Sequence, residues 1–289
     1  MTIYGLSSKE KNYVLKMLVR GWKMFDISLN EKYLIKSENS SIGIQEKYYK
    51  DGYWYKLDNY GGEANAEMLT SLVLQNSTLF ENEYVTYESG MVNNKTACRS
   101  KNFLKENEEL ITFRMMHEII VGCPFGKPIL GKDYQTKIEY CMNFFEKYCN
   151  LDISSYLAKT FYLDMIIRNE DRNFGNLAVI YNTESDKYTI APIFDNGFSL
   201  LVGNEPYKHN GSIEERIKNV TGKPFVSNLE IQAKYFDVPF EINYKRLYEQ
   251  ISIMKSSIQK EVLMFQLEKY QNVFSCDKSI SEKIEELEL

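Results

Sequence analysis

The strongest constraint on the fold is a change of sequence pattern near residue 100. From Ile27 to Arg99, short aromatic and β-branched runs are separated by Gly, Asn, Asp and Ser, which is typical of strands joined by turns. After Asn102, apolar residues recur at the three- and four-residue spacings of helices. This order predicts an α+β chain with two lobes, a β-rich N-lobe at 1–101 and a larger, mainly helical C-lobe at 102–289. Such an arrangement favours an enzyme with a cleft between the lobes.

The same patterns predict the individual elements. In the N-lobe we expect one helix, at 63–75, and strands at 33–35, 53–57, 84–87 and 95–99. In the C-lobe we expect helices at 134–148 and 155–168, a hairpin of strands at 177–181 and 188–193, and two or three helices between 241 and 289.

Composition argues against several classes of protein. With 35 Lys and Arg against 40 Asp and Glu, the net charge of −5 is opposite to the basic character of most nucleic-acid-binding domains. Five cysteines without a C-x-x-C pair and only two histidines argue against a disulfide framework and a zinc site, so a metal would need oxygen ligands. The sequence shows neither a signal-peptide pattern nor an apolar run of ~18–20 residues. We expect a soluble, cytoplasmic protein that binds neither membranes nor nucleic acid directly.

The residues best suited to chemistry follow the predicted helix at 155–168. Asp171 and, five residues later, Asn176 lie in a polar loop, and the hairpin that follows leads to Asp195. Because a hairpin folds back on itself, Asp195 can arrive beside Asn176. One carboxylate to accept a proton, together with an amide oxygen and a second carboxylate for a divalent cation, suits phosphoryl transfer. Each residue taken alone is also a common turn former, so the hypothesis rests on the joint pattern.

A matching phosphate site is expected in the N-lobe. The chain has neither a P-loop nor a G-x-G-x-x-G fingerprint. Instead, small residues surround Gly43 in the segment 40–45, where backbone N–H groups and hydroxyls can face an anion. Lys56 is the best candidate for pairing with nucleotide phosphates, although a lysine on a strand surface is the simpler interpretation of this residue alone. An ion pair to Glu67 on the next helix can hold Lys56, and Glu63 is the alternative partner.

These motifs, in this order, resemble the HipA-like kinases, a bacterial branch of the protein-kinase-like fold that includes HipA toxins and CtkA-type kinases. The segment 40–47, SSIGIQEK, is similar to the S-x-x-G-x-Q-x-K loop of that family. Asp171 and Asn176 match its catalytic-loop Asp and Asn, and Asp195 matches its metal-binding Asp. The similarity extends from about residue 37 to residue 197. The Asp171 motif by itself also resembles lipid kinases and aminoglycoside phosphotransferases.

The resemblance implies a role for each matched residue. Asp171 would accept the proton of the acceptor hydroxyl, Lys56 would contact the ATP phosphates during catalysis, and Asn176 and Asp195 would bind Mg²⁺. Ser40 lies where family members autophosphorylate, and a phosphate there would disturb a loop that holds ATP. The residues implied in binding ATP are Lys56 with its partner Glu67, and the phosphate loop with Ser40, Ser41, Gly43 and Gln45. The strand end at 99–103, with Arg99, Ser100 and Lys101, would be the hinge against which adenine lies, contacted through backbone atoms.

Two departures from the family pattern bear on the function. The histidine that many relatives carry in the catalytic loop is absent from the segment 171–176, DRNFGN. We also expect the additional N-terminal subdomain of HipA toxins to have no counterpart here. The predicted function is an ATP- and Mg²⁺-dependent protein serine/threonine kinase with autophosphorylation. The partners implied are a protein substrate, which can be the chain itself, and an antitoxin-like regulator. The alternatives are a small-molecule or lipid phosphotransferase of the same fold and a non-catalytic nucleotide-binding protein.

Overall fold

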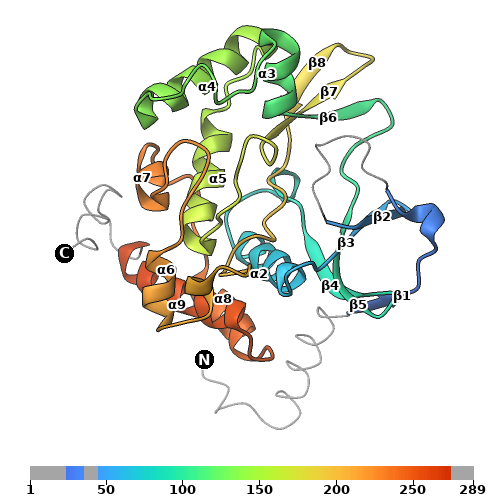
Figure 1. Ribbon diagram of the computed structural model, residues 1–289, viewed down its shortest axis with the longest axis vertical. Helices are drawn as coiled ribbons and strands as arrows, with labels where there is room; N and C mark the ends of the chain where they lie inside the picture. Colours follow the sequence, from blue (N-terminus) through green and yellow to red (C-terminus); the bar gives the residue numbers. More distant parts are fainter. Residues whose placement is uncertain (1–23, 36–44, 275–289) are drawn as a thin grey trace.

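The N-terminal part of the molecule is a twisted five-stranded sheet. The computed structural model describes residues 24–35 and 45–274. The strand order is β1-β4-β5-β3-β2, in which β1 pairs with β4 in parallel and the other pairs are antiparallel. Figure 1 shows this sheet on one side of the molecule, with α2 packed beside it. The strands are β1 (Phe25–Ile27), β2 (Lys47–Lys50), β3 (Tyr53–Leu57), β4 (Tyr87–Val92) and β5 (Lys95–Lys101).

The two faces of this sheet have different neighbours because side chains alternate along a strand. On one face, an apolar cluster with Phe25, Tyr55 and Ala97 closes a small separate core. The other face turns Tyr87 and Cys98 toward Ala64 of α2 (Glu63–Gln75). The register of β3 and β5 pairs Lys56 with Cys98, so Lys56 points to the α2 side.

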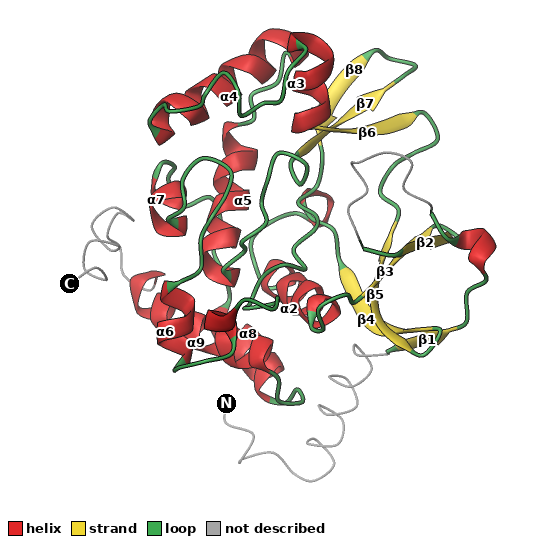
Figure 2. Ribbon diagram, in the orientation of Figure 1, coloured by secondary structure: helices red, strands yellow, loops and turns green. Residues whose placement is uncertain are grey.

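The remainder of the molecule is mainly helical and is organised around α5 (Ser154–Ile167). Figure 2 shows helices on most of this part, with the three-stranded sheet β6-β7-β8 beside α3. The elements are β6 (Glu108–Thr112), α3 (Phe113–Val121), α4 (Tyr134–Cys149), β7 (Ala178–Asn182), β8 (Lys187–Ile190), α6 (Ile213–Lys218), α7 (Leu229–Lys234), α8 (Tyr244–Ser252), α9 (Ile258–Phe274), and the short 3₁₀ helices η2 (Glu31–Tyr33), η4 (Glu81–Glu83) and η5 (Pro206–Lys208).

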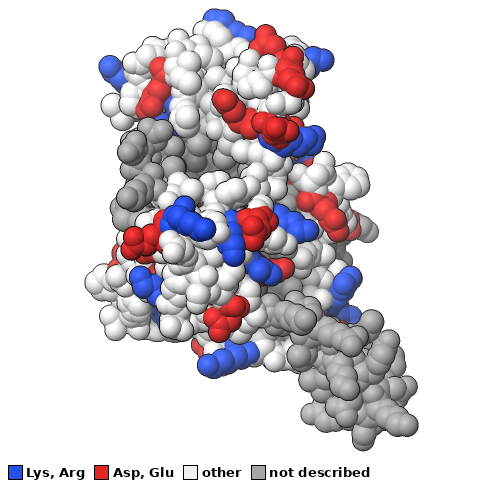
Figure 3. Space-filling view, turned by 90° about the vertical axis from the view of Figure 1, so that its right-hand side faces the viewer, with Lys and Arg blue, Asp and Glu red and all other residues white. Residues whose placement is uncertain are grey.

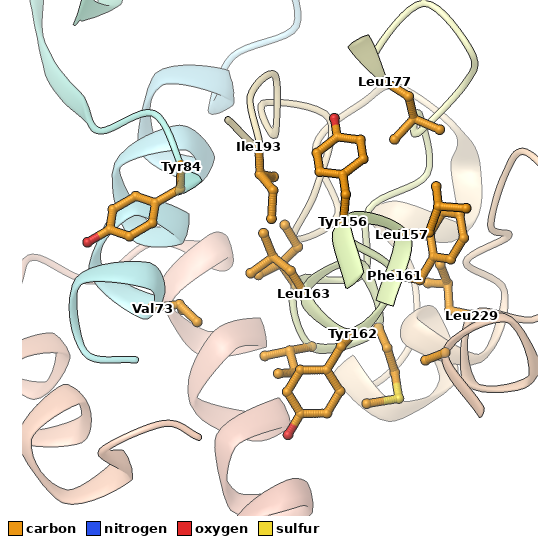
Figure 4. Packing of buried hydrophobic residues seen from close by; sticks show 14 of the residues in the cluster. Val73, Tyr84, Tyr156, Leu157, Phe161, Tyr162, Leu163, Leu177, Ile193 and Leu229 are labelled. Atoms are coloured by element: carbon orange, nitrogen blue, oxygen red, sulfur yellow. The ribbon is translucent and has the colours of Figure 1, made fainter. Parts of the chain in front are cut away.

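Helix α5 is the centre of the main core. It is apolar on nearly all sides, which is the pattern of a helix enclosed by others. Its side chains reach toward Val73 of α2 on one side and Leu229 of α7 on the other (Figure 4). Such a helix gives the loop that follows it a rigid base.

Helix α2 is tied to the C-terminal helices as well as to the sheet. Near its first turn, Asn65 Nδ2 donates a hydrogen bond of 2.8 Å to Ser257 Oγ. At its other end, Asn76 Nδ2 donates to Gln250 Oε1 at 2.7 Å, and the carbonyl of Asn76 accepts from the N–H of Asn243 at 2.8 Å. Residues of α2 also belong to the same apolar cluster as α5. The division of the chain at residue 101 stays a prediction, since α2 packs into the helical part.

Several predicted elements are confirmed and others are wrong. The helix at 63–75, the helices corresponding to α4 and α5 and the β7–β8 hairpin are confirmed to within a few residues. The predicted strand at 33–35 is wrong, because this segment contains the end of η2 and a single bridge from Leu34 to Tyr48. The strand expected at 84–87 begins only at Tyr87. Among the described residues, no helix is long and apolar enough to span a bilayer.

Candidate active site

Lys56 lies at the meeting point of three segments that are distant in sequence. Its Nζ is 2.7 Å from Oδ1 of Asp195, which is 139 residues away, and 3.2 Å from Oε1 of Glu67 on α2. The Lys56 side chain is 12% exposed and that of Glu67 is 1% exposed. The structure therefore brings together Lys56, Glu67 and Asp195, as the sequence motifs predict.

Glu67, and not Glu63, is the partner of Lys56. Its second oxygen, Oε2, accepts a hydrogen bond of 3.0 Å from the backbone N–H of Asn196. Glu67 thus holds both the lysine and the backbone next to Asp195. Glu63 instead accepts hydrogen bonds of 2.8 Å from the N–H groups of Asn59 and Tyr60 at the start of α2.

The charges of this group are strongly coupled. Burial alone would raise the pKa of Asp195, but the ammonium groups of Lys56 and Lys47 outweigh burial and lower the pKa to about 2. Burial would lower the pKa of Lys56, but Asp195 and Glu67 outweigh it and raise the pKa well above its ordinary value. Burial raises the pKa of Glu67, and Lys56 opposes this rise. Lys56 and Asp195 are therefore an ionised pair at neutral pH.

Asp195 has a backbone conformation that non-glycine residues rarely adopt. Its φ is +59°, in the left-handed region, where such residues are strained by about 1 kcal/mol or more. Its backbone N–H donates to the hydroxyl of Tyr87 at 3.3 Å, and the next N–H, of Asn196, is held by Glu67. These contacts fix the carboxylate on the side of Lys56.

The loop with Asp171 and Asn176 closes on itself. Asn176 Nδ2 donates to the carbonyl of Asp171 at 2.7 Å, and the backbone N–H of Asn173 donates to the same carbonyl at 2.7 Å. The Asp171 carboxylate is 42% exposed, and its Oδ1 lies 3.0 Å from Nζ of Lys223. The spacing of five residues therefore allows the Asn176 side chain to reach back to the Asp171 carbonyl and close the turn.

Arg172 joins this loop to the Asp195 segment. Its fully buried guanidinium forms an ion pair of 3.0 Å with Asp164 of α5 and donates to the carbonyl of Phe194 at 2.6 Å. It also donates to the carbonyl of Asn176 at 3.3 Å and to the side chain of Asn196. Because one guanidinium holds the backbones on both sides, Asn176 and Asp195 are neighbours in space.

Sequence analysis missed the pair of Arg172 and Asp164. A signal was present, since Asp164 interrupts the apolar run FYLDMII of a helix. A charge at such a position requires a partner, because an unpaired buried carboxylate is very costly. Arg172, next to the candidate catalytic Asp171, is the partner that the structure provides.

The oxygens available near Asp195 fit Mg²⁺ bound together with a nucleotide. Lys56 contacts Oδ1 of Asp195, and the hydrogen bond from Asn176 to Asp171 uses the amide nitrogen of Asn176, which leaves its amide oxygen out of that bond. Mg²⁺ takes one or two such protein oxygens with phosphates and waters completing the shell. Within 24–35 and 45–274, no group of three or more His, Cys, Asp or Glu side chains could hold a metal by itself. An ion bound by Asn176 and Asp195 would need oxygens from the nucleotide.

Of the residues predicted to form the phosphate loop, the structure describes only Gln45. Ser40, Ser41 and Gly43 lie outside the described residues. Gln45 donates from Nε2 to the carbonyl of Leu57 at 2.6 Å, next to Lys56 in the chain.

The predicted adenine hinge lies at the end of β5. Arg99 turns its side chain away from Lys56, since it pairs with Glu88 and lies over the rings of Phe25 and Tyr53. Any contribution of Arg99 to a nucleotide site must come from its backbone. Ser100 is buried on the Lys56 face and Lys101 is exposed.

Trp54 was not predicted near the hinge, whereas Asn102 falls within the predicted hinge at 99–103. Trp54 lies on the Lys56 face of β3, and its Nε1 donates to Oδ1 of Asn102 at 3.2 Å. This hydrogen bond fixes the indole beside the strand that leads out of the sheet.

The distribution of charged side chains on the surface can be compared with that of nucleic-acid-binding proteins. A continuous basic patch is the usual electrostatic footprint of such binding. On the face drawn in Figure 3, Lys and Arg side chains are interspersed with Asp and Glu.

Comparison with known proteins identifies the fold. No protein-family model matches the chain, and no curated protein matches its sequence. The crystal structure of the proinflammatory kinase CtkA of Helicobacter pylori matches with a TM-score of 0.60 at 16% identity, covering 90% of this chain and 98% of that one. The chain has a CtkA-like kinase fold. The predicted α+β class and the resemblance to this group are thereby confirmed.

A second match is weaker than the one to CtkA. A structure described as the Shewanella oneidensis MR-1 toxin–antitoxin system of HipA, HipB and operator DNA aligns with a TM-score of 0.41 at 9% identity. It covers 92% of this chain and 71% of that one. The fold assignment rests on the match to CtkA.

Proposed function

We propose that this protein is an ATP- and Mg²⁺-dependent kinase that transfers the γ-phosphoryl group of ATP to a serine or threonine hydroxyl. The observation that carries the proposal is the ion pair between Lys56 of the sheet and Asp195, held by Glu67, on a kinase fold. A lysine paired with a helix glutamate and facing an acidic metal ligand is the arrangement that kinases use to position ATP.

Each residue has a distinct role in this proposal. Lys56 contacts the phosphates of ATP, and Asp195 and Asn176 provide the protein oxygens for Mg²⁺. When bound, Mg²⁺ would neutralise part of the negative charge of the phosphates. Asp171, whose carboxylate is partly exposed, accepts the proton of the attacking hydroxyl. Transfer then depends mainly on position and on charge compensation.

The acceptor is proposed to be a protein, and the chain itself is one such acceptor. Ser40 belongs to the loop for which autophosphorylation is expected. Phosphopeptide mapping after incubation with ATP tests this point, and a protein without a modified residue in the segment 40–47 would contradict it.

The test of the function uses purified full-length protein, radiolabelled ATP and Mg²⁺. Wild type is expected to incorporate label, while Asp171→Ala loses about 10²–10⁴-fold in rate, the usual contribution of a general base. Asp171→Ala should still bind ATP, because the contacts of Lys56, Glu67 and Asp195 do not include Asp171. Asp237→Ala, which removes an exposed aspartate in the loop after α7, is the matched control and should keep full activity.

The other outcomes select other functions. Binding of ATP without transfer or turnover indicates a nucleotide-binding protein without catalysis. Consumption of ATP only after a metabolite extract is added indicates a small-molecule phosphotransferase.

A further inference from the structure

A lysine from a distant loop lies against the candidate catalytic base. Lys223 is 52 residues from Asp171 in sequence, and its Nζ is 3.0 Å from Asp171 Oδ1. The side chains are 52% and 42% exposed. Ion pairs this exposed contribute little to stability, so the contact is not explained as a device that holds the fold together.

The backbone of Lys223 is nevertheless held firmly. Gln232 of α7 is completely buried and donates from Nε2 to the carbonyl of Lys223 at 2.8 Å, while its Oε1 accepts from the N–H of Phe225 at 3.1 Å. The ring of Phe225 packs against Phe174 of the Asp171 loop, with centroids 5.5 Å apart. The loop that carries Lys223 therefore packs directly against the loop that carries Asp171.

The contacts of the Asp171 carboxylate are one-sided. Lys223 Nζ and Asn173 Nδ2 both donate to Oδ1, at 3.0 and 3.2 Å. Among the described residues, these side-chain donors leave Oδ2 as the oxygen that can face an acceptor hydroxyl.

The Asp171 loop also contains a cation of its own, but that cation is used elsewhere. Arg172 is fully buried and paired with Asp164. Transfer of a phosphoryl group needs positive charge near the oxygens that gain charge in the transition state. The exposed ammonium beside Asp171 is that of Lys223, and its three N–H donors allow it to contact a carboxylate and a phosphoryl oxygen together.

We propose that Lys223 positions the Asp171 carboxylate and donates to the phosphoryl group during its transfer. This inference rests on the proposed function. The acceptor oxygen forms a bond to the γ-phosphorus, and its proton passes to Oδ2 of Asp171. The bond from the γ-phosphorus to the bridging oxygen breaks, and its electron pair leaves with ADP.

The test compares Lys223→Met and Lys223→Arg with wild type in the full chain. Lys218→Met is the matched control, because Lys218 is an exposed lysine of α6 that pairs only with exposed Glu214 among the described residues. For each variant, kcat, the Kd for ATP measured by calorimetry, and the melting temperature are determined. Lys223→Met is expected to lower kcat by about 10²-fold, within the range of loss for one stabilising donor, and to leave the Kd and the melting temperature unchanged. Lys223→Arg should recover at least about a tenth of the wild-type kcat because it keeps the charge.

Three results would overturn the inference. The first is a kcat of Lys223→Met equal to that of Lys218→Met. The second is an equal loss in the Met and Arg variants, because the charge would then not matter. The third is a wild type that binds ATP and transfers no phosphate, which removes the proposed function and this inference with it. An active wild type with an active Lys223→Met variant removes the inference alone.

Discussion

Replacing Arg172 by methionine tests the link between the two loops of the candidate active site. The variant removes a guanidinium that is completely buried and leaves Asp164, also completely buried, without its cation. It also removes the hydrogen bonds to the carbonyls of Phe194 and Asn176. Breaking a buried ion pair from one side costs about 3–5 kcal/mol, because a buried charge is left uncompensated.

Such a loss can be measured by thermal and urea unfolding. At roughly 2–4 °C per kcal/mol for domains of about this size, the melting temperature should fall on the order of 10 °C. The control is Arg246→Met, which changes an exposed arginine on α8 and should cost less than about 0.5 kcal/mol. The double variant Arg172→Met with Asp164→Leu should recover much of the loss, since both charges are then gone.

The loss of stability in Arg172→Met should depend on pH in a defined direction. Burial raises the pKa of Asp164, and in the wild type Arg172 opposes this rise. Without Arg172 the folded-state pKa rises further above its unfolded value, so the deficit of Arg172→Met should shrink as the pH falls and the carboxyl becomes neutral. A deficit below about 1 kcal/mol at neutral pH, or one that grows on acidification, would refute this account of the Arg172 contacts.

Two further predictions follow from single positions. The pKa of Asp195, lowered to about 2, means that its contribution to stability is complete above its ordinary value near 4 and is lost as the pH falls from about 4 to 2. In urea unfolding over that range, Asp195→Asn should therefore lose less stability than wild type, and parallel curves would contradict the ion pair. Gly90→Ala should destabilise by about 1–3 kcal/mol, because a Cβ there would lie 2.3 Å from the carbonyl oxygen of Phe25. Gly126→Ala, where a Cβ meets nothing within 4 Å, should be close to neutral, and equal effects at the two glycines would show that β1 and β4 are not packed as described.

The part of the site that could be predicted from sequence depends on local pattern. The β7–β8 hairpin returns the chain toward the Asp171 loop, and the alternation of β3 fixes the face on which Lys56 lies. Those features, with the motifs, were sufficient to anticipate that Lys56 and Asp195 meet, whereas the sequence left the choice between Glu67 and Glu63 open. The roles assigned to these residues remain predictions.

Other features have no local pattern from which they could be predicted. The strand expected at 33–35 failed because Tyr33 lies in a turn of 3₁₀ helix capped by Asn30, while Leu34 is extended but forms only a single bridge, to Tyr48. The pairing of Lys223 with Asp171 depends on a loop anchored on α7, and no pattern in the segment around Lys223 singles this residue out. The alternation of β5 turns the Arg99 side chain to the face opposite Lys56, so the predicted adenine hinge can use only the backbone of this residue, and the hinge stays a prediction.

The attachment of α2 at both ends has a consequence for regulation. In protein kinases, control is commonly exerted by moving the helix that carries the glutamate partner of the active-site lysine. Here that displacement would break the hydrogen bonds of Asn65 and Asn76 to the C-terminal helices and would expose part of the main core. These contacts hold Glu67 beside Lys56, so under the proposed function we expect control to act on the supply of nucleotide or on access of the acceptor to Asp171.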